Sequence, residues 1–240
     1  MAVPAAPGDS TGGRRVDLNA DLGEEVTDDA GLLAVVTSAN LACGYHAGNR
    51  RIMREVCAEA ARRGVSVGAQ VSYDDRENFG RVARNVPYEL LREQVVDQVG
   101  TLRDIASPEG IEVRYLKPHG ALYHRVMDDE EQAAAVLAGS GHLPVLGMPG
   151  ALVLRLAADA GRATYLEGFP DRGYGEDGRL LPRDRPGAVL SDADEIATRA
   201  VDLAAEVDSV CVHGDSPGAV ANAGAVRSAL EAAGFDLRGL

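Results

Sequence analysis

The chain has 240 residues, a formal net charge of −13, 45% apolar residues and 25% charged residues. This composition is typical of a globular protein with a hydrophobic core, and the acidic charge argues against a nucleic-acid partner. No apolar run reaches about 18 residues, so the sequence predicts no transmembrane helix and no membrane partner.

The N-terminal stretch MAVPAAPGDSTGGRR has no basic start followed by an apolar core, so it does not predict a secretory signal. Its Pro, Gly and Ala content predicts a disordered tail over residues 1–14. The three cysteines, Cys43, Cys57 and Cys211, lack the spacing of a metal knuckle. Their odd number and the missing export signal indicate a reducing cytoplasm.

From residue 15 onward, short β-type runs alternate with helical segments. The predicted strands cover 15–23, 35–46, 65–73, 113–123, 143–150, 163–171 and 209–215. The predicted helices include 50–63, 88–105, 151–160, 192–206 and 219–233. Because each return to a parallel strand needs a crossover helix, this alternation predicts a parallel sheet. No linker interrupts it, so we expect one α/β domain over 15–240.

One segment breaks this rhythm and predicts an excursion or a small hairpin. It covers 172–190 and is rich in Gly and Pro. Every predicted strand except the fifth ends in polar or titratable residues. In TSANLACGYHAGN, for example, Asn40 and His46 follow an apolar run. Because parallel α/β folds bind ligands at the carboxyl edge, we expect a polar pocket there.

Two motifs carry most of the candidate chemistry. In LKPHGALYH, Lys117 is suited to bind a carboxylate or to become a base of lowered pKa, and His119 to act as acid, base or ligand. The alternative is a solvated lysine with a capping histidine. In CVHGDSP, His213 and Asp215 suit proton transfer, although Asp215 could instead cap the next helix.

Two further motifs are weaker. In NADLGEE, the alternation of a strand places Asn19 and Asp21 on one face, where Asp21 is a base, a metal ligand or a turn former. In FPDRGY, Arg172 would suit a substrate carboxylate, and a surface ion pair with Asp171 is the alternative. No phosphate loop or dinucleotide-binding glycine motif occurs in the sequence.

Taken together, seven ordered motifs resemble those of the LamB/YcsF family. They are VDLNADLGE, VTSANLACGYHAGN, NFGR, LKPHGALYH, DRGY, DGRL and CVHGDSP, and the likeness runs from about Val16 to the C-terminus. The resemblance implies an irregular (β/α)7 barrel related to the glycoside hydrolase/deacetylase fold. This fold agrees with the seven βα units found from the sequence pattern.

The resemblance also implies ATP-dependent opening of the 5-oxoproline lactam to glutamate, together with 5-oxoprolinase subunits B and C. Since the chain has no phosphate loop, we expect the partner subunits to handle ATP. The predicted catalytic residues are Asp21, His46, Lys117, His119, His213 and Asp215. The predicted substrate-binding residues are Asn19, Asn40, Arg172 and Tyr123.

The chain departs from the family pattern at three positions. Gln70 and Val71 replace a His-Pro pair, and Asn49 replaces an aspartate, which would strip an imidazole and a carboxylate from the pocket rim. Two alternative functions therefore stay open. One is a metal-dependent, deacetylase-like hydrolase in which Asp21, His46 and His119 hold a divalent metal. The other is a catalytically silent paralogue that binds a small acid.

Overall fold

Seven parallel strands close into a barrel in this computed structural model, which describes residues 14–26, 28–215 and 218–240. The strands are β1 (Arg15–Leu22), β2 (Ser38–Ala42), β3 (Ser66–Val71), β4 (Val113–Pro118), β5 (Val145–Gly147), β6 (Thr164–Gly168) and β7 (Ser209–Val212). The barrel closes because β1 pairs with both β2 and β7. The predicted (β/α)7 barrel is therefore confirmed. The division into a tail, 1–14, and one domain, 15–240, stays a prediction, and 1–13 lie outside the described residues.

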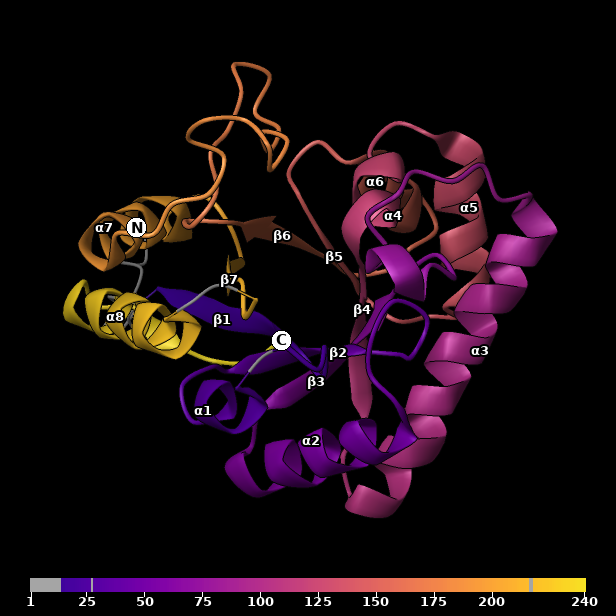
Figure 1. The fold of residues 1–240 in the computed structure, drawn as a ribbon, viewed down its shortest axis with the longest axis horizontal. Coiled ribbons are helices and arrows are strands. Elements are labelled where there is room, and N and C mark those ends of the chain that lie inside the picture. The colour runs from indigo at the N-terminus through magenta and orange to yellow at the C-terminus, as the bar shows by residue number, and fades with distance from the viewer. Residues whose placement is uncertain (1–13, 27, 216–217) are drawn as a thin grey trace, which may run out of the picture.

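Helices surround the barrel, as Figure 1 shows. They are α1 (Asp29–Leu33), α2 (Arg50–Arg63), α3 (Tyr88–Ala106), α4 (Gly120–Arg125), α5 (Glu130–Gly139), α6 (Leu152–Asp159), α7 (Ala193–Ala204) and α8 (Ala219–Ala232). Two 3₁₀ turns, η1 (Arg76–Asn78) and η2 (Ser107–Glu109), and a short strand, β8 (Asp236–Leu237), complete the elements. Within the described ranges, no helix has the length and apolarity to cross a membrane.

Local sequence signals explain several of these boundaries. The side chain of Asn49 accepts hydrogen bonds from the backbone N–H groups of Arg51 and Ile52, which caps the start of α2. The same helix ends at Gly64, whose φ of 69° is readily adopted by glycine. Asp129 and Asp192 cap α5 and α7 in the same manner as Asn49. The ends of these helices are therefore fixed by single residues.

The segment 172–190 leaves the barrel between β6 and α7, where Figure 1 shows it as an orange loop beyond the strand ends. Antiparallel bridges join Arg172 to Val189 and Tyr174 to Leu180. The predicted excursion or small hairpin is confirmed. Because this segment follows a strand, it lies at the carboxyl edge of the barrel.

The interior of the barrel is polar below this edge. Asp17 accepts hydrogen bonds from Thr37 Oγ1 at 2.6 Å and from Ser38 Oγ at 2.7 Å, and burial raises its pKa to about 6. The hydroxyl of Tyr115 donates to Asn40 Oδ1 at 2.7 Å. These bonds satisfy buried polar groups and give the site above them a fixed floor.

Candidate active site

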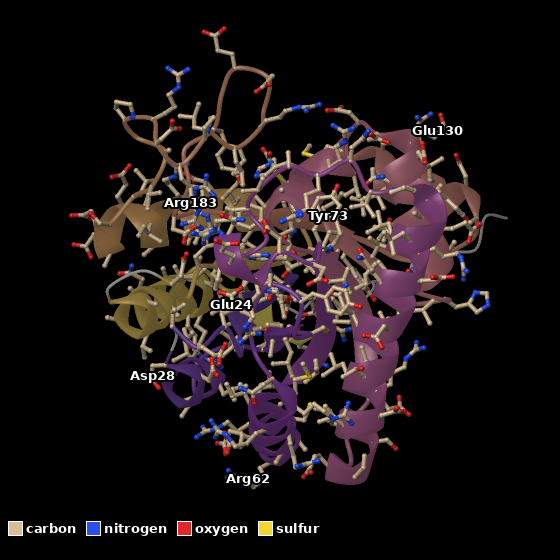
Figure 2. The ribbon with its side chains drawn as sticks, turned by 45° about the vertical axis from the view of Figure 1, so that its right-hand side comes forward. Glu24, Asp28, Arg62, Tyr73, Glu130 and Arg183 are labelled. Carbon is tan, nitrogen blue, oxygen red and sulfur yellow. The ribbon has the colours of Figure 1, made fainter. Side chains whose placement is uncertain are left out.

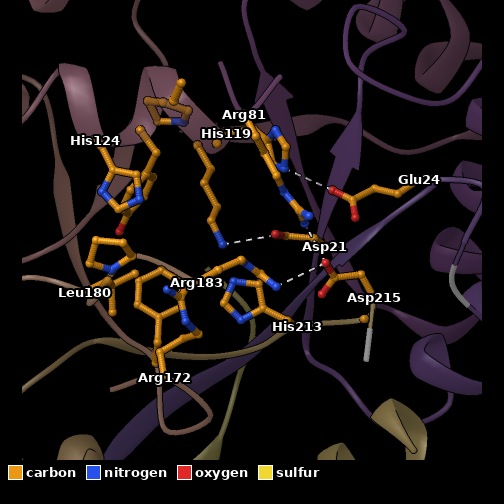
Figure 3. A pocket seen from close by; sticks show the side chains of 18 of the residues that line it. Asp21, Glu24, Arg81, His119, His124, Arg172, Leu180, Arg183, His213 and Asp215 are labelled. Atoms are coloured by element: carbon orange, nitrogen blue, oxygen red, sulfur yellow. Dashed lines mark hydrogen bonds and ion pairs between the residues drawn. The ribbon is translucent and has the colours of Figure 1, made fainter. Parts of the chain in front are cut away.

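A cavity of about 370 Å³ opens at the carboxyl edge of the barrel (Figure 3). Its wall combines the ends of β1, β4, β6 and β7 with residues 180–183 of the excursion. Seven predicted site residues line it: Asp21, Lys117, His119, Tyr123, Arg172, His213 and Asp215. The other three, Asn19, Asn40 and His46, are buried and do not line it. The pocket predicted from the strand ends is therefore present.

Lys117 is a buried cation at the centre of the site. Its Nζ lies 3.1 Å from Asp21 Oδ1 and 2.8 Å from Glu167 Oε1, and 3.3 Å from the Sγ of Cys211. Burial disfavours the charged amine, but the two carboxylates raise the pKa of Lys117 well above its ordinary value. The alternatives of a solvated lysine and of a base with a lowered pKa are therefore wrong.

Asn19 and Asn40 hold the carboxylates around this lysine. Asn40 Nδ2 donates to Asp21 Oδ1 at 2.8 Å and to Asn19 Oδ1 at 2.6 Å. Asn19 Nδ2 donates to Glu167 Oε1 at 3.0 Å and to Ser209 Oγ at 2.6 Å. Both amides thus lie among protein groups beneath the cavity.

Asp21 is held in its ionised form. Burial alone would raise the pKa of this carboxyl, but the charge of Lys117 and then that of His213 keep its pKa below the ordinary value. Because its Oδ1 is already bonded to Lys117 and Asn40, Asp21 is committed to this network.

A second cluster lies at the wall of the cavity and contains Glu24, His46 and His119. Glu24 Oε1 is 3.5 Å from the Nε2 of each histidine, and the two imidazole rings stack with centroids 3.9 Å apart. Figure 2 shows Glu24 near the middle of the molecule, whereas Arg62 lies at its outer edge. Burial and then His46 lower the pKa of His119 well below its ordinary value. These three side chains form a group of potential metal ligands.

The departures from the family pattern have different structural settings. Asn49 is an exposed helix cap, so the expectation that it belongs to the pocket rim is wrong. Gln70 is fully buried, and no atom of its amide has a hydrogen-bond partner in the described part of the chain. Val71 is buried, and its carbonyl accepts from the N–H of His119 at 2.8 Å. Only Gln70 therefore adds a functional group near the site.

His213 is paired with Asp171 on the other side of the cavity. Its Nδ1 lies 3.0 Å from Asp171 Oδ2, and its backbone N–H donates to the same oxygen at 2.9 Å. Burial would lower the pKa of His213, but the carboxylate of Asp171 raises it. This pairing orients the imidazole and favours its protonated form.

Asp215 lies between two arginines of the cavity wall, as the dashed lines of Figure 3 show. Its Oδ2 is 2.5 Å from Arg81 and 3.3 Å from Arg183. The first turn of α8 has no side-chain cap, and Gly218 occupies its N-cap position. The alternative that Asp215 caps this helix is therefore wrong.

Arg172 and Tyr123 line the cavity, but their polar groups are hydrogen-bonded to other protein atoms. Arg172 donates through Nε to Ala188 O at 2.8 Å and through a terminal nitrogen to Leu181 O at 2.7 Å. It is 5% exposed, so the alternative of a surface ion pair is wrong. Tyr123 donates its hydroxyl to Glu167 Oε2 at 3.0 Å.

Three prominent site residues were not predicted: Glu24, Arg81 and Arg183. Glu24 follows directly after the DLG of the first motif, and the charge at a strand end could have marked it. Arg81 lies within the NFGR motif, but no strand precedes it. Arg183 lies in the excursion, where sequence pattern does not reveal which side chains turn toward the barrel.

Comparison with solved structures defines the class of this fold. A structure named T48 deacetylase with substrate aligns over 95% of this chain and 88% of its own length, with a TM-score of 0.51 and 13% identity. At this identity the likeness concerns the fold alone. The chain is a deacetylase-like (β/α) barrel with its cavity at the carboxyl edge.

Closer relatives define the family. The LamB/YcsF family model matches residues 16–240. A Streptomyces griseus protein, named as the A subunit of 5-oxoprolinase, is 49% identical over 93% of this chain and 98% of its own length. The Lactam Utilization Protein from Thermus thermophilus has 36% identity and a TM-score of 0.87, covering 94% of this chain and all of that one. The chain belongs to the LamB/YcsF family, which confirms the resemblance found in its motifs.

Proposed function

We propose that this protein is the A subunit of an ATP-dependent 5-oxoprolinase, which opens the lactam of 5-oxoproline to glutamate together with subunits B and C. One observation carries the proposal: in a chain of net charge −13, the lining of one cavity holds four cationic side chains, Arg81, Lys117, Arg172 and Arg183, against three carboxylates. The substrate is a small anion with an amide to be broken. The names of the family relatives support the same reaction.

Arg183 and Arg81 are the proposed partners of the substrate carboxylate. Both line the cavity, and Asp215 holds their guanidinium groups on one side of it. Arginine binds carboxylates through two parallel hydrogen bonds, which gives orientation as well as affinity. Arg172, predicted for this task, instead anchors the segment that carries Arg183.

Lys117 is the proposed stabiliser of charge on the lactam oxygen. It is a fixed cation at the cavity floor. Such a cation stabilises the charge that develops in a transition state most strongly where water is excluded. Asp21, Asn19 and Asn40 keep its ammonium in place. Tyr123 holds Glu167, the second carboxylate that pairs with Lys117, through a hydrogen bond from its hydroxyl.

His213 is the proposed carrier of the proton that the ring nitrogen takes up when the amide bond breaks. Asp171 raises its pKa, so it is ready to donate near neutral pH. Glu24 and His119 line the opposite wall, and the buried His46 stacks on His119.

The partner subunits are the proposed site of ATP chemistry, because this sequence has no phosphate-binding loop. We further propose that the protein works in the cytoplasm. Its three cysteines are all buried, and they form no disulfide within the described ranges. Free thiols fit a reducing compartment.

Reconstitution tests the proposal directly. The purified chain alone should not convert 5-oxoproline, with or without ATP, whereas addition of the cognate subunits B and C should give glutamate. Omission of this chain from the complete mixture is the control. Robust ATP-dependent turnover by the lone chain would contradict the division of labour. Binding of 5-oxoproline without turnover in the complete mixture would favour the silent paralogue.

A further inference from the structure

Glu24, His46 and His119 come from the ends of three different strands and meet at one point. Glu24 follows β1, His46 follows β2 and His119 follows β4. Their exposed fractions are 3%, 1% and 8%. One ligand atom from each lies within 4.8 Å of the others. Buried polar side chains normally have a bonding partner, so the convergence of these three from separate strands requires an explanation.

Hydrogen bonding among themselves does not supply that reason. Glu24 Oε1 and both ring nitrogens of His46 have no hydrogen-bond partner among the described residues, and the same holds for Nδ1 of His119. Ser72 Oγ, close to the same point, is also without one in this part of the chain. Burying a polar atom without a hydrogen-bond partner destabilises the folded protein. A metal ion bound between the side chains would give Glu24 Oε1 and His46 Nε2 the partner that they lack.

The distances from Glu24 Oε1 to the two histidine nitrogens fit a small divalent cation. Glu24 Oε1 lies 3.5 Å from His46 Nε2 and 3.5 Å from His119 Nε2. Zinc binds nitrogen and oxygen ligands at about 2.0–2.2 Å in a tetrahedron, which separates neighbouring ligand atoms by about 3.3–3.6 Å. Two imidazoles and one carboxylate are a donor set that zinc and similar metals prefer.

Gly80 lies close to both histidines of the trio and to Ser72. A Cβ built on Gly80 would lie 3.0 Å from His46 Cβ, 3.2 Å from His119 Nδ1 and 2.2 Å from Ser72 Oγ. The carboxylate that lies with the two histidines is Glu24, whereas Asp21 Oδ1 is bonded to Lys117. The carboxylate expected from the sequence is thus replaced by one three residues later.

We propose that Glu24, His46 and His119 bind a divalent transition-metal ion such as Zn²⁺. Glu24 and His119 line the cavity, so the open side of the site faces the space where we place the substrate. A metal there would polarise a carbonyl oxygen or activate a water. This inference deepens the proposed function but does not rest on it.

The test uses the full chain without a histidine tag, stripped of metal with a chelator. Isothermal titration with Zn²⁺, and the visible spectrum on titration with Co²⁺, should each show one ion bound per chain, with a tetrahedral cobalt spectrum. Glu24→Gln, which nearly preserves shape, should weaken binding more than about tenfold. Glu25→Gln is the matched control, since Glu25 pairs with Arg76 outside the trio, and it should bind as the wild type does.

Thermal melts of each stripped variant verify that the fold is retained. His46→Asn is the second ligand variant, so the result does not depend on one substitution. Absence of binding, or binding unchanged in both Glu24→Gln and His46→Asn, would overturn the proposal. Neither ATP nor 5-oxoproline nor subunits B and C enter the experiment. Its outcome is therefore independent of whether the 5-oxoprolinase proposal holds.

Discussion

Lys117 and Glu167 form an ion pair of 2.8 Å inside the barrel, with side chains that are only 3% and 0% exposed. Asp21 completes the group from β1. The charge at the cavity floor is therefore part of the folded structure as well as part of the site. Substitutions here should affect stability and activity together.

Lys117→Met should lower the free energy of unfolding by about 3–5 kcal/mol, because it leaves two buried carboxylates without their cation. Denaturant unfolding of Lys117→Met, Glu167→Gln and the double variant measures the coupling, which should exceed about 1 kcal/mol. Additive effects would show that the pair is not energetically linked.

His213 should titrate above the ordinary histidine pKa of about 6.5 and shift downward in Asp171→Asn. A raised folded-state pKa stabilises the protein fully below about 6.5 and loses that contribution as pH rises through the raised value. The melting temperature should therefore decline across this window more in the wild type than in Asp171→Asn. NMR titration of the imidazole gives the direct measurement. Identical titration of His213 in both proteins would contradict the pairing.

Arg183→Ala should weaken binding of 5-oxoproline by roughly ten- to a hundredfold, the effect of losing a charge-assisted hydrogen bond. A lactam without a carboxylate, 2-pyrrolidinone, should lose little affinity. Titration calorimetry on the isolated chain or the reconstituted complex makes the comparison. Arg185→Ala, in the same segment but away from the cavity lining, is the control. Equal losses for both lactams would place the carboxylate elsewhere.

Arg172→Ala should release the excursion from the barrel, because it removes the donors to Leu181 O and Ala188 O. Limited proteolysis should then cut within 173–190 faster than in the wild type, and ligand binding should weaken with it. Arg172→Lys keeps the charge but not the planar fork, so it should behave more like the alanine variant than like the wild type. Unchanged cleavage in both variants would disprove the anchoring.

Gly80→Ala should destabilise the protein by about 1–3 kcal/mol. Its φ of 66° strains any other residue, and the added Cβ would press on Ser72 and His46. Gly100→Ala is the matched control, since Gly100 lies inside α3 with nothing within 4 Å of the new Cβ. That change should stabilise by about 0.5–1 kcal/mol. Thermal and denaturant unfolding distinguish the two.

The barrel could be predicted from sequence because its signals are local. Each strand except the fifth is a short apolar run ended by polar residues, and Asn49 and Asp192 cap the helices α2 and α7. Three helices, α1, α4 and α5, are not among those predicted. The residues of α4 read as a continuation of the strand that ends at Pro118.

The site could be predicted in outline but not in its pairings. Lys117, Asp21 and His213 face the cavity as expected, because parallel strands bring their carboxyl ends together. The spacing of residues along the sequence does not show which carboxylate pairs with which cation in the folded protein. The metal-dependent alternative groups Asp21 with His46 and His119, whereas the structure places Asp21 with Lys117 and Glu24 with the histidines.

The position of Leu240 has a practical consequence for measuring assembly. Its N–H donates to Ser38 Oγ at 3.2 Å and its carbonyl accepts from Ser66 Oγ at 2.8 Å. Ser38 and Ser66 begin β2 and β3, so this residue lies at the amino edge, across the barrel from the cavity. A biotin or linker placed after it would hold the molecule on a sensor surface with the cavity facing the flow. Partner proteins and small acids could then be injected against an unobstructed face.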